Sequence, residues 1–252
     1  MDALHRIVHT FFDPAILGRT LPTLLRVGLP NTLLLSIAAM VMGVVVGLLV
    51  ALLLLSKRRW LYGLGRAYVD VFRGLPHIVS IYLIGQGLPL VGAALFGGNT
   101  YLYAAFAIGL VEGAYIAEIF RSGIRGVDRG QVEAAESLGL SYGQTMRHVV
   151  LPQAARIILP ALTGQLILVI KNTALVFLLG LAPGQRELFA IAQDFSSNLA
   201  SLTPLVAAGM VYLVITIPLT YLVAALDRAM GKGSGRMRPR LRQRGDALQE
   251  AV

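Results

Sequence analysis

The 252-residue chain is strongly apolar: 56% of its residues are hydrophobic, 14% are charged, and the mean hydropathy is +0.71. An average soluble domain carries about 25% charged residues, and several apolar runs here approach the roughly 20 residues that cross a bilayer, so the composition predicts an all-α polytopic membrane protein. The absence of cysteine excludes disulfides and thiol catalysis. The net charge of +9 gathers at the ends of apolar segments, which fits a lipid membrane as partner and not nucleic acid.

The N-terminal segment, residues 1–27, mixes aromatic, basic and apolar side chains and is predicted to form an amphipathic helix at the membrane interface. It lacks the short apolar run and small-residue cleavage site of a signal peptide. The first predicted span, residues 28–55, ends at a basic run, Lys57 to Arg59, followed by Trp60. Basic residues and tryptophan mark a cytoplasmic interface, so we expect the N-terminus outside.

Five spans are predicted within a transmembrane domain at 28–228. The second contains Gly74 and Pro76, which are tolerated at membrane depth where other parts of the protein satisfy the freed backbone groups. A cytoplasmic loop is expected at 121–156 and an outer loop with a short helix at 182–201. The predicted spans are residues 28–55, 61–90, 100–120, 157–181 and 202–226.

The distribution of basic residues supports this topology. Only Arg6, Arg19, Arg26 and Arg186 fall on the predicted outer side, whereas most others fall on the cytoplasmic segments. The arginine-rich tail at 229–252 is predicted to be disordered and cytoplasmic. No internal repeat is evident, which weighs against an inverted-repeat secondary transporter.

The predicted cytoplasmic loop has the pattern of a helix–turn–helix. Its first helix begins with acidic residues around Glu133, where the helix dipole favours them, and Gly139 supplies a permissive backbone for the turn. Ser141 can cap a second helix, and Pro152 is expected to break that helix before the next span. A solvated linker between spans is the alternative reading of the composition.

The spacing of this loop resembles the EAA motif of permease subunits of ATP-binding-cassette (ABC) importers. Val149 stands where isoleucine is commoner, and Gly130-Gln131 matches the family's GQ. The segment 113–124, together with Arg73-Gly74-Leu75-Pro76, resembles the polar amino-acid subfamily, and the similarity covers residues 28–228. The residues in register with the EAA motif are Glu133, Ala134, Ala135, Gly139, Leu151 and Pro152.

The resemblance implies that the loop sits in a groove on an ATPase subunit and couples it to the membrane domain. Glu133, Ala134, Ala135 and Gly139 are then contact and turn residues, with the alanines allowing close seating. The implied partners are two ATPase subunits, which bind ATP-Mg, a second permease copy or sister permease, and an external solute-binding protein. The implied location is a prokaryotic inner membrane, and this chain itself binds no cofactor.

Ionisable residues at membrane depth are costly and are functional-site hypotheses by default. Pairing between groups, such as Glu118 with Arg121 one turn later, is the alternative, and it is favoured for residues in the family's motif positions. Glu112 could face a cationic substrate group, a lipid headgroup or Lys171, and His77 is more often packed than a ligand. The substrate-path candidates are Asp70, Arg73, Glu112, Glu118, Lys171 and Asn172.

Two departures from the subfamily bear on the substrate. Asn172 and Ala174 replace the aspartate and serine of its KDTSL motif, which lowers the local negative charge. Basic, neutral polar and sulfur-containing amino acids, and opine-like compounds, all remain candidates.

Catalytic motifs are missing from the chain. Gly231-Lys232-Gly233 lacks the leading glycine and the hydroxyl of a phosphate-binding loop, and the histidines form no HExxH. The chain is therefore predicted not to be an enzyme. A channel or ion-coupled carrier that uses the buried acids, and a membrane scaffold or sensor, are the competing functions.

Overall fold

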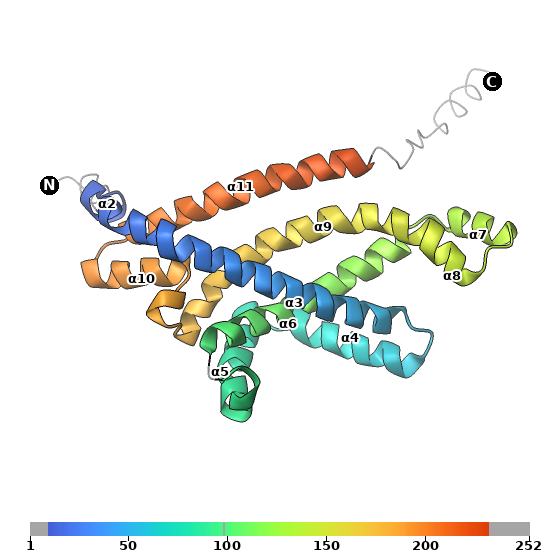
Figure 1. The fold of residues 1–252 in the computed structure, drawn as a ribbon, viewed down its shortest axis with the longest axis horizontal. Helices are drawn as coiled ribbons and strands as arrows, with labels where there is room; N and C mark the ends of the chain where they lie inside the picture. Colours follow the sequence, from blue (N-terminus) through green and yellow to red (C-terminus); the bar gives the residue numbers. More distant parts are fainter. Residues whose placement is uncertain (1–9, 98, 232–252) are drawn as a thin grey trace, which may run out of the picture.

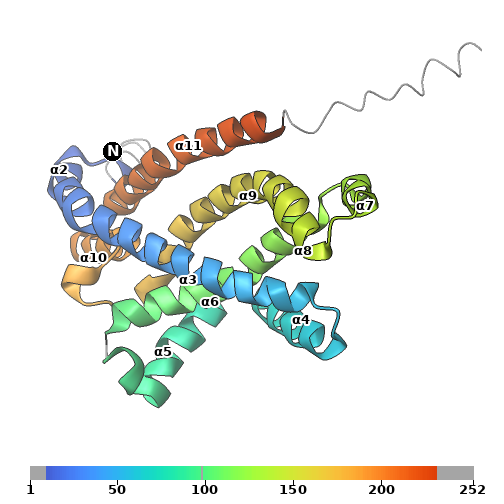
Figure 2. The same cartoon turned by 45° about the vertical axis from the view of Figure 1, so that its right-hand side comes forward.

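A computed structural model describes residues 10–97 and 99–231, and nearly all of them are helical. The first nine residues of the predicted interfacial segment and, from residue 232 on, the predicted disordered tail at 229–252 lie outside this part. Residues 229–231 of that predicted tail are helical. Helices α2 and α10 lie at one end of the molecule, and the short helices α7 and α8 lie at the other, together with the C-terminal end of α11 (Figure 1). The same arrangement is visible after a 45° turn (Figure 2).

The first long helix is continuous from Pro14 to Leu55. It consists of α2 (Pro14–Thr23), a π-helical turn (Leu24–Gly28) and α3 (Leu29–Leu55), and Asp13 caps its start. In the π turn the Leu29 N–H donates to the carbonyl of Leu24, five residues back. This register change precedes Pro30, which has no N–H to donate, so the helix continues through the proline. The predicted boundary at residue 27 is therefore not a break in the backbone.

The predicted second span is two helices, α4 (Arg59–Gly74) and α5 (His77–Phe96), with 108° between Arg59–Gly74 and His77–Leu90. Leu75 at the bend is extended, with φ −89° and ψ 145°, because the ring of Pro76 disfavours helical geometry in the residue before it. Four helices in the described part are long and apolar enough to cross a membrane. The predicted five spans are reached when the bent pair counts as one.

Helix α6 (Thr100–Arg125) packs closely against α3 through small residues on both helices. Gly43 and Gly47 on α3 face Gly109 and Gly113 on α6, each pair spaced by four residues. An added Cβ at Gly47 would lie 2.7 Å from Ile116 Cγ2 and 3.0 Å from the Gly113 carbonyl oxygen. Without a hydrophobic drive between helices in lipid, such close packing is what holds them together.

The loop after α6 contains α7 (Arg129–Ser137), α8 (Tyr142–Thr145) and a π-helical turn, Met146–Val150, which leads directly into α9 (Leu151–Asn172). The prediction that Pro152 breaks the helix is wrong. Pro152 lies in the first turn of α9, and the preceding π turn carries the helix past it, so the chain is helical from Tyr142 to Leu179. The last part is a 3₁₀ helix, Thr173–Leu179, which ends at Gly180 with φ +69°.

The connection to the last span is built from a 3₁₀ turn (Pro183–Gln185) and α10 (Leu188–Leu199), the short helix expected in this loop. The final helix, α11, runs from Thr203 to Gly231. Leu188 and Ala192 of α10 pack with Leu24 and with Ala207 of α11 in a buried apolar cluster. This cluster fixes the end of the bundle opposite the α7–α8 loop.

Candidate functional site

A buried carboxylate, Glu112, is the centre of a polar cluster between three helices. Its side chain lies on α6 and has no solvent exposure. Gln165 Nε2 of α9 donates to Glu112 Oε2 over 2.5 Å, and Asn172 Nδ2 donates to Oε1 over 2.6 Å. A buried charge requires such partners, since an isolated carboxylate would be strongly destabilised in an apolar interior.

The bend between α4 and α5 supplies the other side of this cluster. His77 Nε2 lies 3.8 Å from Glu112 Oε1, an ion pair when the imidazole is protonated, and the His77 ring stacks on Tyr115 with 5.1 Å between centroids. The guanidinium of Arg73 lies 5.3 Å from the centroid of the same Tyr115 ring, a cation–π contact. The bend thus places His77 beside the buried acid, and Arg73 joins the cluster through the Tyr115 ring that both side chains contact.

The structure brings together three of the predicted substrate-path residues: Arg73, Glu112 and Asn172. Glu112 occupies neither a lipid-headgroup position nor an ion pair with Lys171, whose side chain is exposed. The sequence interpretation did not count Gln165 or Tyr115 among the substrate-path candidates, and it favoured a packing role for His77. The one available signal was the amide of Gln165 within a largely apolar span.

Two of the remaining candidates, Glu118 and Asp70, form local pairs away from this cluster. Arg121 Nη2 lies 2.5 Å from Glu118 Oε2, so the pairing expected from their spacing is present. Arg66 Nε donates to Asp70 Oδ2 over 2.8 Å, and both side chains are about half exposed. Neither pair shares a partner with Glu112 in the described structure.

The loop has the predicted helix–turn–helix geometry, but its first helix begins at Arg129 and not with the acids around Glu133 as expected. Gly139 adopts φ +81°, a left-handed conformation that favours glycine, and the Leu140 N–H donates to the Ala135 carbonyl. Ser141 and Gln144 form a reciprocal capping box at the start of α8. The turn is thus closed by backbone geometry and by two side chains.

Within this loop the motif residues differ in exposure. Glu133 and Ala134 are exposed, whereas Ala135 is only 4% exposed and packs inside the loop. The expectation that Ala135 contacts a partner therefore conflicts with its burial. Leu151 and Pro152 begin α9 and are exposed.

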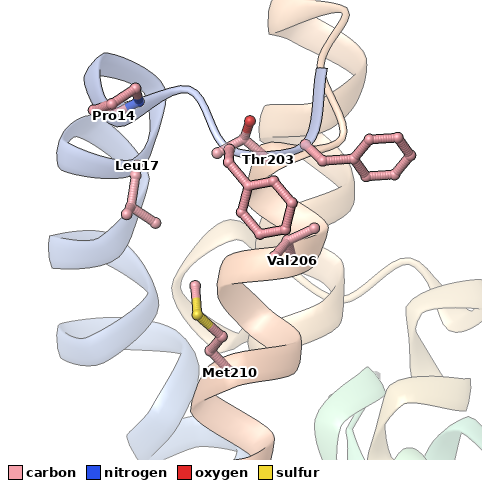
Figure 3. Close-up of a pocket in the computed structure, with 7 residues that line it drawn as sticks. Pro14, Leu17, Thr203, Val206 and Met210 are labelled. Carbon is pink, nitrogen blue, oxygen red and sulfur yellow. The ribbon is translucent and has the colours of Figure 1, made fainter. Parts of the chain in front are cut away.

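A small pocket lies at the other end of the molecule, between the N-terminal segment and α11 (Figure 3). Thr203 is its one polar residue, and the Thr203 hydroxyl accepts a hydrogen bond from the Asp13 N–H. Such a lining gives a polar solute little to bind. The lining residues are Phe11, Phe12, Pro14, Leu17, Thr203, Val206 and Met210.

Residues 43–232 match the model of one protein family, described as the inner membrane component of binding-protein-dependent transport systems. The chain belongs to this family. It is a membrane permease component and not an enzyme, and the family works in the inner membrane with a solute-binding protein and, in ABC transporters, an ATPase.

Curated relatives agree with this membership. The probable amino-acid permease YxeN of Bacillus subtilis strain 168 is 37% identical over 212 residues, which cover 84% of this permease and 92% of the relative. The arginine transport system permease ArtQ of the same organism is 34% identical over 204 residues, covering 81% and 90%.

A solved structure also resembles this permease. The crystal structure of an amino acid ABC transporter with histidines matches with a TM-score of 0.71 and 31% identity, over 91% of this chain and 99% of that one. The inward-facing MetNI methionine transporter matches with a TM-score of 0.67 and 21% identity, over 86% and 97%, and shows the shared fold.

Proposed function

We propose that this permease forms the translocation path of an ATP-driven importer of polar or charged amino acids. The relatives include permeases named for arginine, glutamine, and glutamate and aspartate, so the class of cargo is shared although the individual amino acid varies. The observation that carries the proposal is the buried Glu112 of α6 with its partners from α5 and α9.

The chemistry of this cluster suits an amino acid. Every free amino acid carries an ammonium and a carboxylate, and the cluster offers Glu112 to the first and Arg73 to the second, with the ring of Tyr115 beside Arg73. Glu112 Oε1 accepts one close hydrogen bond, from Asn172, and an ionised carboxylate oxygen can accept another. The substrate ammonium would bind at Glu112 Oε1, on the side where His77 Nε2 lies 3.8 Å away.

The coupling role falls to the α7–α8 loop. We assign Glu133 and Ala134 as exposed contacts with an ATPase subunit and Gly139 as the turn that holds them. Two ATPase subunits with ATP-Mg, two permease copies or sister permeases, and an external solute-binding protein complete the assembly. The loop and the basic run Lys57 to Arg59 that follows α3 then face the cytoplasm, with the N-terminus outside and the C-terminus inside.

Uptake measurements with the whole transporter in proteoliposomes test the path. Glu112→Gln removes the charge and is expected to lower uptake about tenfold or more, since 1.4 kcal/mol of lost binding is a factor of ten. Asp70→Asn is the matched control because its carboxylate is exposed and bonded to Arg66. Equal uptake by both variants would contradict the assignment of Glu112.

Charge reversal tests the coupling role. Glu133→Lys is expected to weaken co-purification of the ATPase, while Arg147→Glu, an exposed reversal on the following π turn, is expected to leave it intact. Uptake that needs a proton or sodium gradient and proceeds without the ATPase would instead support an ion-coupled carrier.

A further inference from the structure

The tip of the α7–α8 loop presents two large apolar side chains to solvent. Leu138, the residue that follows α7, is 84% exposed, and Tyr142, the first residue of α8, is 71% exposed. They flank the Gly139 turn, four residues apart. Other strongly exposed apolar residues, such as Leu34 and Val214, lie on the long apolar helices, where lipid can cover them.

Lipid does not explain the exposure of Leu138 and Tyr142 in the same way. Helix α7 exposes Arg129, Glu133 and Glu136, and the loop extends from the end of the bundle beyond α6 and α9 (Figures 1 and 2). Apolar side chains among such groups mark a surface that is covered by another protein. Tyrosine is enriched among the dominant contacts of interfaces, and burial of a leucine side chain removes a large apolar area from water.

The backbone presents these side chains in a fixed geometry. The Leu138 N–H donates to the Ala134 carbonyl, and the Gly139 N–H donates to the Glu136 carbonyl. The Ser141–Gln144 capping box fixes the position just before Tyr142. Little conformational entropy is then lost at this turn on binding, which favours affinity.

We propose that Leu138 and Tyr142 are the apolar anchors of the contact with the ATPase, inserted into an apolar pocket whose rim carries basic groups. The exposed pair Glu133 and Glu136, three residues apart on one face of α7, faces that rim. The inference rests on the proposed coupling role and goes beyond it. It assigns most of the binding energy to two residues outside the EAA triplet, while the buried Ala135 serves the loop's own packing.

The test compares four variants of the full-length permease, each purified in detergent without the ATPase and then titrated with the purified ATPase subunit. Leu138→Ala and Tyr142→Ala are each expected to raise the dissociation constant for the purified ATPase subunit at least about tenfold, as hot-spot truncations do. Tyr142→Phe retains the ring and is expected to bind within a few-fold of the unmodified permease. Trp60→Ala removes an aromatic side chain that is 62% exposed on α4 and is expected to bind normally.

Thermal unfolding of each permease variant without the ATPase separates binding from folding. Both alanine variants are expected to unfold at the unmodified temperature because the two side chains are mostly exposed. Normal ATPase affinity in both alanine variants, with the unmodified permease binding well, would overturn the inference and leave the proposed function standing. Failure of the unmodified permease to bind would instead count against the proposed function. Loss of permease–permease association in the alanine variants with ATPase affinity unchanged would also overturn the anchor assignment.

Discussion

Asn172 of α9 donates a 2.6 Å hydrogen bond to Glu112 Oε1 of α6, and so joins two long helices at a fully buried carboxylate. Gln165, the other donor on α9, lies seven residues earlier, which is two helical turns and the same face. Lys171 is rotated from that face by about 100° and is exposed. Helix phase therefore gives the buried acid an amide partner and directs the adjacent cation away from it.

Removal of this amide should destabilise the helix pair. In Asn172→Leu, Glu112 Oε1 loses its close donor while it stays buried, and an unsatisfied buried group costs about 1–3 kcal/mol. The apparent unfolding temperature of the detergent-solubilised permease should fall. Lys171→Leu changes the neighbouring exposed residue and should leave that temperature nearly unchanged. Equal shifts in both variants would argue that helix phase does not set the stability here.

Side-chain pairs within one helix could be predicted from the sequence, whereas pairs between helices could not. Glu118 and Arg121 lie one turn apart on one helix, so their ion pair followed from the sequence alone. The partners of Glu112 lie 53 and 60 residues away, and their choice depends on how α6 and α9 pack. The continuity of the helix through Pro152 was missed for a related reason, because a π turn is a register change that proline patterns do not reveal.

The α3–α6 contact predicts that alanine is destabilising at Gly47 but not at Gly164, a glycine of α9 with open space around it. In Gly47→Ala the new Cβ would meet Ile116 Cγ2 at 2.7 Å and the Gly113 carbonyl oxygen at 3.0 Å, so the helices must separate. Overpacking of this kind costs about 1–3 kcal/mol, and the unfolding temperature should fall.

Gly164→Ala is the control, because an added Cβ at this α9 position meets nothing within 4 Å. Alanine is favoured over glycine inside a helix by about 1 kcal/mol. Gly164→Ala should therefore leave the unfolding temperature unchanged or raise it. A fall in Gly164→Ala as large as in Gly47→Ala would show that the close approach of α3 and α6 is not the cause.

The loop turn gives a prediction about coupling. Gly139→Ala places a side chain at φ +81° with open space around it, so the cost is conformational, roughly 1–2 kcal/mol. The turn should rearrange and ATP-dependent uptake should fall. Gly143→Ala, an exposed position in α8 with equally open space, should retain uptake. Full uptake in Gly139→Ala would mean that the left-handed turn is dispensable for coupling.

Glu187 lies between the last two long helices and is fully buried at the N-cap of α10. Its carboxylate accepts hydrogen bonds from the N–H groups of Phe189 and Ala190 and from the Tyr212 hydroxyl of α11. Burial raises the pKa of the Glu187 carboxyl from 4.5 to about 7, and these hydrogen bonds partly oppose the rise. The group therefore links the packing of α10 on α11 to pH.

The sign of this pH dependence follows from proton uptake. Between pH 4.5 and about 7 the folded protein holds a proton on Glu187 that the unfolded chain has lost, so its stability falls as pH rises through this window and levels off above it. The whole window corresponds to a change in the free energy of unfolding on the order of 3 kcal/mol.

Unfolding temperatures measured from pH 5 to 8 should decline in the unmodified permease. Glu187→Gln cannot ionise, so its unfolding temperature should decline less over this range, although it loses part of the cap at every pH. Parallel pH profiles for the two proteins would exclude Glu187 as the titrating group.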